Sequence, residues 1–382
     1  MKTLVPKLPV RVLICPDKFK GTLGAIQAAE AIAEGWRRTR PDDRLELHPI
    51  SDGGDGFGEL LARHLGAEER TVETVDAAHR PIRAVWWWVP KRRTAIIESA
   101  RVIGLAMLPA GRYHPFELDT WGLGLVLLEA WKLKPLHTLI GIGGSATNDA
   151  GFGLARALGW TFLDEQGRTL DRWTELRRLH RIVGFSRKPH PGRVTIAVDV
   201  RNPLLGRRGA TRIYGPQKGL RPEDLPMAEK ALGRVVKVLD EQSRFQADLA
   251  GREGAGAAGG LGFGLSAFVG GPLEPGFELF ARMTGLIEKL SPADLIITGE
   301  GAIDETTVSM GKGVGEIGRK CRRLRRPCWA LGGVVANADR ARKVFTQVHA
   351  MAPDLTSPET ARRHAAKWLA ELAFRTARAW TR

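Results

Sequence analysis

The first sixty residues alternate between short apolar runs and an amphipathic segment. Residues 11–15 (RVLIC) are apolar after Arg11, a pattern that is typical of a strand buried in a parallel sheet. Apolar residues then recur at helical spacing over residues 23–36, with Thr22 as a candidate N-cap. Residues 44–50 (RLELHPI) have the pattern of a second strand, and the glycine-rich residues 51–59 that of a loop. This order of elements predicts a parallel sheet covered by helices.

The last third of the chain repeats that order. Residues 293–301 (ADLIITGEG) and 327–335 (PCWALGGVV) each have a strand pattern that runs into glycines, and residues 343–351 (KVFTQVHAM) have a third. Residues 357–380 are amphipathic at helical spacing, with Ser357 as the candidate N-cap. Both ends of the chain therefore predict pieces of an α/β domain.

The middle of the chain has a different pattern. Residues 70–90 and 93–100 have neighbouring strand patterns that favour antiparallel pairing, and a length of 382 residues favours two domains. We therefore predict an α/β fold with a Rossmann-like parallel-sheet domain built from both chain ends and an inserted mixed α+β domain. The first would comprise residues 1–75 and 271–382, and the second residues 76–270.

The chain carries a large positive charge. Its 58 Lys and Arg against 42 Asp and Glu give a formal net charge of +16. Nucleic acids and anionic membranes attract such chains. The cations are spread along the sequence, however, which is equally consistent with a protein that handles anionic small molecules. No run of about 18 apolar residues occurs, so no membrane span is predicted.

The three cysteines, Cys15, Cys321 and Cys328, lack metal-ligand spacing. The first residues do not have the apolar segment of a signal peptide. These features predict inert thiols in a reducing, cytoplasmic environment.

Five polar loops directly follow strand patterns, and several combine glycine with Asp or Glu. They are residues 16–21 (PDKFKG), 51–56 (SDGGDG), 143–149 (GGSATND), 199–206 (DVRNPLLG) and 298–304 (TGEGAID). In open parallel sheets such loops gather at the carboxyl ends of the strands, where ligands bind. Glycine lets backbone N–H groups approach a phosphate, and carboxylates can hold Mg²⁺ or accept a hydroxyl proton. These are the components of phosphoryl transfer.

Each loop taken alone is better explained as turn chemistry, because Gly, Ser, Asn and Asp are common turn and cap residues. It is the coincidence of five that favours a shared site. The common nucleotide fingerprints are absent: no G-x-x-x-x-G-K-[ST] occurs, and a GxGxxG at Gly313, Gly315 and Gly318 does not directly follow a strand. The glycine-rich residues 253–264 are a candidate hinge or ligand loop, with close helix packing as the alternative.

Taken together, these phrases resemble the bacterial glycerate kinase family of the type that forms 2-phosphoglycerate. The resemblance covers nearly the whole chain in one order, through CPDKFKGTLGAIQAAEAIAEGW, PISDGGDGFGELL, IIESARVIGL, GIGGSATNDAGFGLARALGWTFLD, DVRNPLLGRRGATRIYGPQKG, GAGAAGGLGFGLSAF and ADLIITGEGAID. It implies a two-domain transferase with the active site in the cleft between the domains. It also implies ATP as phosphoryl donor, Mg²⁺, and transfer to the 2-hydroxyl of D-glycerate. The partners would be these small molecules, without nucleic acid or membrane.

Within the loops we expect one group of residues to bind phosphate and substrate. Backbone N–H groups and a hydroxyl would contact phosphate, an amide and a carboxylate would contact glycerate or Mg²⁺, and Gln217 and Lys218 would meet the carboxylate of the acceptor. The full set is Gly143, Gly144, Ser145, Asn148, Asp149, Asn202, Gln217, Lys218, Asp52, Gly53 and Gly54.

A second group would perform the transfer. Asp199 is the first candidate to orient and deprotonate the hydroxyl, and Asp304 the second. Lys20 would neutralise phosphate charge, with Asp17 as a metal or hydroxyl partner. Glu300 and Asp304 are the candidate Mg²⁺ ligands, directly or through water, and Asp52 could assist them.

The chain departs from the family pattern in several places. Ala302 replaces the usual Arg after GEG, and Thr306 replaces a Gln. The segment from Asp304 to Lys312 is one residue longer than usual, Phe57 replaces a Thr, and Leu123 interrupts a Gly-Thr-Gly. Since Arg binds carboxylate and phosphate bidentately, its loss leaves two alternatives open: a kinase for another small hydroxy acid, or a non-catalytic ligand-binding relative. Another arginine could also compensate.

Overall fold

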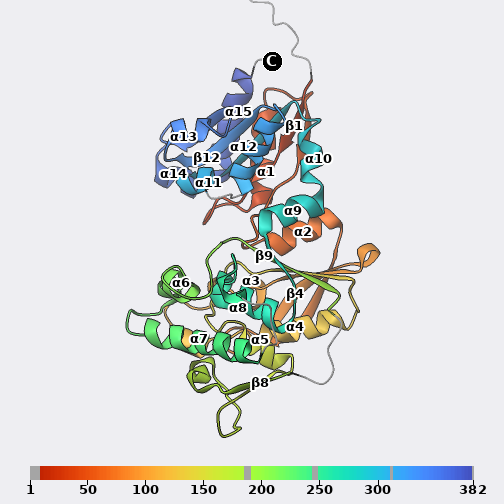
Figure 1. Ribbon diagram of the computed structural model, residues 1–382. Helices are drawn as coiled ribbons and strands as arrows, with labels where there is room; N and C mark the ends of the chain where they lie inside the picture. Colours follow the sequence, from red (N-terminus) through yellow and green to blue (C-terminus); the bar gives the residue numbers. More distant parts are fainter. Residues whose placement is uncertain (1–8, 185–190, 243–247, 310–312, 381–382) are drawn as a thin grey trace, which may run out of the picture. The chain divides into compact units, whose positions relative to one another are not determined.

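The computed structural model describes residues 9–184, 191–242, 248–309 and 313–380 (Figure 1). Residue contacts divide the chain into two compact units. Unit 1 comprises Met1–Asp52 and Phe280–Arg382, and unit 2 comprises Gly53–Leu279. The predicted α/β architecture is confirmed, because unit 1 has a parallel sheet with strands from both ends of the chain and unit 2 is inserted with a mixed sheet.

The sheet of unit 1 has five strands, all parallel, in the order β13-β12-β11-β1-β2. Counted along the chain within this unit, that is the 2-1-3-4-5 order of a doubly wound sheet. The chain runs outward from β1 to β2 and returns on the other side of β1 with β11, so the topological switch point lies between β1 and β11. The strands are β1 (Arg11–Ile14), β2 (Arg44–Leu47), β11 (Leu295–Ile303), β12 (Cys328–Val335) and β13 (Gln347–Ala352).

Helices cover both faces of this sheet (Figure 1). On one face α1 and α15 pack against each other, and Gly35 of α1 permits this because a Cβ there would lie 1.9 Å from the carbonyl oxygen of Ala370. On the other face α12 packs on β11 and β12. The helices are α1 (Ala25–Arg37), α10 (Leu286–Leu290), α11 (Glu305–Ser309), α12 (Gly313–Arg323), α13 (Ala338–Arg342), α14 (Pro358–Arg363) and α15 (Ala365–Ala379).

Two predicted caps have different outcomes. Ser357 does cap a helix, because its hydroxyl accepts from the Thr360 N–H at 3.2 Å. That helix ends early, and a break at His364 separates α14 from α15 where one helix was predicted. The prediction for Thr22 was wrong: Gly24 is the N-cap of α1, and the Thr22 hydroxyl donates to the Phe19 carbonyl within a turn.

The sheet of unit 2 has six strands in the order β10-β9-β6-β5-β4-β3. Strands β5, β6, β9 and β10 are parallel to one another, whereas β4 pairs antiparallel with both β3 and β5, as the middle of the sequence predicted. A two-stranded sheet of β7 and β8 lies outside it. The strands are β3 (Glu68–Val75), β4 (Pro81–Val89), β5 (Thr94–Glu98), β6 (His137–Gly141), β7 (Thr161–Leu163), β8 (Arg181–Val183), β9 (Arg193–Val198) and β10 (Leu273–Pro275).

Helices and 3₁₀ turns connect these strands and carry much of the core of unit 2 (Figure 1). The helices are α2 (Phe57–Leu65), α3 (Ala100–Ile103), α4 (Trp121–Trp131), α5 (Phe152–Ala157), α6 (Ala210–Lys218), α7 (Leu225–Glu241) and α8 (Ala257–Phe268), while α9 (Gly276–Thr284) crosses the division between the units. The turns are η1 (Pro90–Arg92), η2 (Leu105–Met107), η3 (Pro115–Glu117), η4 (Trp173–Arg178) and η5 (Leu249–Gly251).

The boundaries of the units differ from those predicted at 75 and 270. Residues 53–75 belong to unit 2, because α2 packs on β4 and β5, and β3 pairs with β4 from Glu68 opposite Trp88 to Val75 opposite Pro81. A boundary after residue 75 would have divided this hairpin. At the other end, β10 extends unit 2 beyond residue 270 by pairing with β9.

The three cysteines are free and buried in unit 1. Burial raises the pKa of Cys15 and of Cys328 well above its usual value, which keeps these groups as thiols. Within the described part of the chain, no helix has the length and apolar character needed to cross a membrane.

Candidate active site

A cavity of about 280 Å³ lies at the switch point of unit 1, lined by the loop after β1 and by the carboxyl-terminal half of β11. Residues 298–303, which were predicted as a loop, belong to this strand because they pair with β12. It contains three of the residues predicted from the sequence, Lys20, Glu300 and Asp304. It also contains two cations that the sequence did not single out, Lys18 and Arg362. The other lining residues are Phe19, Thr22, Gly301, Ala302, Gly333, Val334, Met351, Pro358, Ala361 and Ala365.

Asp17 lies beneath this region with a strongly perturbed carboxyl group. Burial, together with repulsion from Asp52 and Glu300, raises its pKa from 3.8 to about 8, although the Lys18 N–H donates to it at 2.7 Å. Two further predicted carboxylates of unit 1, Asp52 and Glu300, are thus close enough to Asp17 to repel its negative charge. A bound proton or a bound cation reduces the repulsion between neighbouring carboxylates.

Threonines at the start of α11 hold Glu300 and a fourth predicted carboxylate, Asp304. Asp304 Oδ1 accepts from the Thr306 hydroxyl at 2.6 Å and from its N–H at 2.8 Å. The Thr307 hydroxyl donates to Glu300 Oε1 at 2.7 Å. Thr306, one of the departures from the family pattern, therefore orients Asp304. The extra residue between Asp304 and Lys312 cannot be assigned a place, because residues 310–312 lie outside the described part of the chain.

Among the described residues, no group of three or more His, Cys, Asp or Glu side chains is arranged to hold a metal ion by itself. Mg²⁺ in phosphoryl-transfer sites is usually held by one or two carboxylates together with phosphate oxygens and water. The carboxylate oxygens of Asp17, Asp52 and Glu300, and the repulsion of Asp17 by the other two, fit such an ion.

A second cavity, of about 380 Å³, lies within unit 2 at the carboxyl ends of β6 and β9. Six predicted residues line it: Gly143, Gly144, Ser145, Asp199, Gln217 and Lys218. The structure adds Asp55, Leu105, Ala106, Val200, Tyr214 and Ala258. Three loops that are far apart in the sequence thus meet in one cavity.

The backbone at Gly143 and Gly144 approaches its neighbours closely. A Cβ on Gly143 would lie 2.5 Å from the Cα of Gly54 and 3.3 Å from Asp199 Oδ2. Gly144 has φ +78°, and a Cβ there would lie 1.9 Å from Asp55 Oδ1. Among the described residues, the N–H groups of Gly143, Gly144 and Ser145 donate no hydrogen bond. Consecutive unpaired N–H groups at a cavity form a site for an anion.

Lys218 brings a buried positive charge to the same cavity. Its side chain is only 8% exposed, and its ammonium group donates to the Thr147 carbonyl at 2.7 Å. Burial lowers the pKa of Lys218 from 10.5 to about 8, against the opposing effect of Asp149 and Asp199. Charged groups with perturbed pKa values in a cavity are typical of functional sites.

Asp149 and Asn148 are both fully buried. Asp149 accepts hydrogen bonds from Thr120, Gly151 and Gly153, which fixes the turn before α5. Burial, with repulsion from Asp119, raises the pKa of Asp149 to about 6. These contacts favour a role in holding the loop over direct contact with a ligand. The Asn148 amide donates to Thr211, while its oxygen is buried without a partner among the described residues.

Asp199 stands at the end of β9, where the sequence placed it, and its loop is held by two further side chains. Asn202 donates to the Arg208 carbonyl at 2.7 Å and accepts from the Tyr214 hydroxyl at 2.6 Å. Burial, with the nearby charge of Asp199, raises the pKa of Tyr214 to about 12. Asn202 thus positions the loop, and Tyr214 is a lining residue that sequence reasoning missed.

Glu98 was also missed, although it organises the SDGGDG loop. It is buried at the end of β5 and accepts from the N–H groups of Gly56 at 2.6 Å and Gly58 at 3.1 Å. Burial raises its pKa, and those two hydrogen bonds oppose the rise. This carboxylate fixes the loop whose Gly53 and Gly54 lie against Gly143.

The glycine-rich residues 253–264 pack against the GGSATND loop. A Cβ on Gly259 would lie 1.9 Å from the Thr147 carbonyl oxygen, and one on Gly264 would lie 2.3 Å from that of Ala150. Close packing, the alternative considered from the sequence, accounts for these glycines.

The remaining departures from the family pattern separate into two kinds. Phe57 and Leu123 are fully buried in unit 2, where they are part of the packing. Ala302 lies in the cavity of unit 1, and Arg362 of α14 lines the same cavity. A guanidinium group is therefore present there despite the alanine.

Comparison with known proteins shows which protein family has this sequence and this fold. The family model described as the glycerate kinase family matches residues 12–381. A glycerate kinase of Halalkalibacterium halodurans is 36% identical over 325 residues, covering 84% of this chain and 85% of that protein. The glycerate 2-kinase of Escherichia coli K12 is 34% identical over 317 residues, covering 81% and 82%.

A crystal structure agrees with these sequence matches. A Salmonella typhimurium LT2 protein assigned as glycerate kinase 2 superposes with a TM-score of 0.82 at 31% identity, covering 97% of this chain and 98% of that one. The chain belongs to the glycerate kinase family. It is thus a kinase, a phosphotransferase of the ATP-using type.

Proposed function

We propose that the protein catalyses the Mg²⁺-assisted transfer of the γ-phosphoryl group of ATP to the 2-hydroxyl of D-glycerate, giving 2-phosphoglycerate and ADP. The 2-position is supported by the similarity to the Escherichia coli glycerate 2-kinase. The observation that carries the proposal is the cavity of unit 2, where unpaired N–H groups, the buried Lys218 ammonium group and the Asp199 carboxylate come together.

In this proposal the cavity of unit 2 binds the acceptor. Lys218 and Gln217 contact the glycerate carboxylate, and Asp199 accepts a hydrogen bond from the 2-hydroxyl. That oxygen attacks the γ-phosphorus, the bond between this phosphorus and the β,γ-bridging oxygen breaks, and ADP leaves. The hydroxyl proton passes to Asp199. The N–H groups of residues 143–145 stabilise negative charge on the phosphoryl oxygens.

The cavity of unit 1 would bind the polyphosphate of ATP. Lys18, Lys20 and Arg362 supply positive charge, and the carboxylates of Asp17, Asp52, Glu300 and Asp304 are the groups that would hold Mg²⁺. The ion would neutralise charge on the β- and γ-phosphates. An active site in a cleft between the two domains remains a prediction of the sequence.

The test is ATP consumption by the purified protein with Mg²⁺ and D-glycerate, with the product identified by phosphorus NMR. A 2-phosphoglycerate resonance supports the proposal, and a 3-phosphoglycerate resonance contradicts its regiochemistry. Ala302 favours one second candidate, a kinase for another small hydroxy acid. A panel of such acids would then give turnover where D-glycerate gives none, whereas a non-catalytic relative would turn over none of them.

A further inference from the structure

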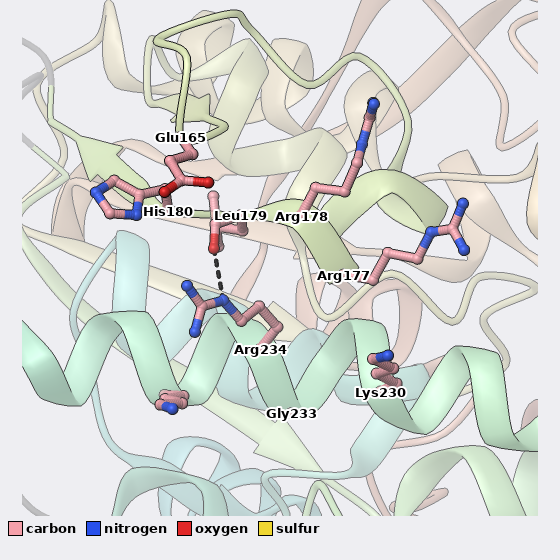
Figure 2. A pocket seen from close by; sticks show the side chains of 9 residues that line it. Glu165, Arg177, Arg178, Leu179, His180, Lys230, Gly233 and Arg234 are labelled. Atoms are coloured by element: carbon pink, nitrogen blue, oxygen red, sulfur yellow. Dashed lines mark hydrogen bonds between the residues drawn. The ribbon is translucent and has the colours of Figure 1, made fainter.

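A third cavity, of about 560 Å³, lies in unit 2 and is rich in positive charge (Figure 2). We call it the basic pocket. Five of its nine lining residues are Arg or Lys, and one is a carboxylate. They are Glu165, Arg177, Arg178, Leu179, His180, Lys230, Gly233, Arg234 and Lys237. None of them lines either cavity of the candidate active site. Its volume lies within the range of small-molecule sites, about 300–1,000 Å³.

Two elements supply the cations. Arg177 and Arg178 end the turn η4, and Lys230, Arg234 and Lys237 lie four and three residues apart on α7, which places them on one face of that helix. The two elements are joined within the pocket, because Arg234 Nε donates to the Leu179 carbonyl at 2.5 Å (Figure 2). The guanidinium group of Arg234 is thereby fixed and half-buried between them.

Much of this charge is not neutralised by the protein. Arg178 pairs with Glu175 at 2.7 Å, and Lys237 lies 3.7 Å from Glu241. Among the residues that the structure describes, the side chains of Arg177 and Lys230 have no ion pair or hydrogen bond. Like charges gathered around one cavity repel one another, and an anion bound there relieves that repulsion.

Gly233 keeps the pocket open on the α7 side. A glycine in the interior of a helix costs about 1 kcal/mol relative to alanine. Close packing does not explain it, because the nearest atom to an added Cβ is Leu205 Cδ1, at 3.9 Å. Gly233 lines the cavity between Lys230 and Arg234, and the helix leaves space at this position.

We propose that the basic pocket binds a small polyanion carrying at least two phosphate groups, at a site separate from the phosphoryl-transfer cavities. Guanidinium groups bind phosphate oxygens in pairs, and lysines add point charges, so several cations around one concave cavity suit adjacent phosphates. The Glu165 carboxylate in the lining disfavours the continuous phosphate backbone of a nucleic acid. The proposal does not rest on the identity of the acceptor.

The probe is inorganic tripolyphosphate, added to the full-length protein without nucleotide. Hydrogen exchange measured by mass spectrometry is expected to slow in the peptides that contain residues 173–183 and 225–241. The variant Arg177→Gln/Lys230→Gln should lose this protection and weaken binding there at least tenfold. The control Arg83→Gln/Lys91→Gln removes the same charge from exposed positions elsewhere in unit 2 and should retain it.

Gly233→Leu tests the cavity without changing its charge. This variant should keep or raise the unfolding midpoint of the protein and lose the protection of the two segments. Equal protection in wild type and both pocket variants would overturn the proposal. So would tighter binding of a 20-base-pair DNA duplex than of tripolyphosphate at the same segments, because it would identify a nucleic-acid surface.

Discussion

Gly259 offers a direct test of how the backbone builds the cavity of unit 2, which we propose binds the acceptor. Its dihedral angles, φ 69° and ψ 34°, are left-handed, and a Cβ there would lie 1.9 Å from the Thr147 carbonyl oxygen. Gly66, the C-cap of α2, has nearly the same dihedral angles, φ 62° and ψ 43°, but open space around its Cβ position. An alanine at either position would adopt the same strained left-handed conformation, but only an alanine at 259 would overlap a neighbouring atom.

The expected magnitudes follow from that difference. The left-handed conformation costs a non-glycine residue about 1–2 kcal/mol, which is the whole expected effect of Gly66→Ala. In Gly259→Ala the oxygen must move by roughly 1.5 Å to reach a normal contact distance, and such overpacking adds about 1–3 kcal/mol. The same oxygen accepts from Lys218 at 2.7 Å, so the movement also displaces the ammonium group. A misplacement of about 1 Å can cost 100-fold in rate.

The assays are urea unfolding followed by tryptophan fluorescence, and kcat/KM with ATP, Mg²⁺ and D-glycerate. Gly66→Ala should lower the free energy of unfolding by about 1–2 kcal/mol and leave kcat/KM within about twofold of wild type. Gly259→Ala should lower that free energy by about 2–5 kcal/mol and reduce kcat/KM by about 100-fold. If the two variants behave alike, the segment 147–148 moves aside at no cost, and the reasoning from the overlap is refuted.

Three further predictions concern charged residues of the two cavities. Because burial lowers the pKa of Lys218 to about 8, the ammonium group loses its proton and the KM for the acceptor should rise as pH increases from 7 to 9. Lys218→Met should have a high KM that does not depend on pH in this range. A wild-type KM that is constant from pH 7 to 9 would contradict the role of the ammonium group. If Arg362 replaces the arginine missing at Ala302, Arg362→Ala should raise the KM for ATP about tenfold, and the double variant with Ala302→Arg should restore the wild-type KM. Arg363 pairs with Glu359 outside the cavity, so the control Arg363→Ala should leave the KM for ATP unchanged. The pKa of Asp17 is raised from 3.8 to about 8 in the folded protein, so without Mg²⁺ the folded state binds more protons than the unfolded state between about pH 4 and pH 8. The contribution of Asp17 to the free energy of unfolding should therefore fall as pH rises from 4 to 8. Asp17→Asn should flatten the dependence of the urea midpoint on pH.

The sequence determined the elements and the chemistry of the loops. A buried parallel strand is a short apolar run, so β1, β11 and β12 could be located. Residues 298–303 were predicted as a loop, but they continue β11, because they pair with β12 up to Ile303 opposite Val335. The same local signals identified Ser357 as a cap. They also supplied Lys20, Asp199 and residues 143–145, which do line cavities.

Only the tertiary structure decided which of these residues are brought together and what supports them. Strand pairing moved residues 53–75 into unit 2, because the partner of β3 is β4. Tyr214 and Arg362 reach their cavities from α6 and α14, and no local signal in the sequence marked either side chain as facing a cavity. Glu98 and Asp149 were visible as carboxylates, but their hydrogen bonds to backbone N–H groups depend on residues distant in the sequence. A local pattern reports the conformation of a segment, whereas burial, pKa and partners are properties of the packed chain.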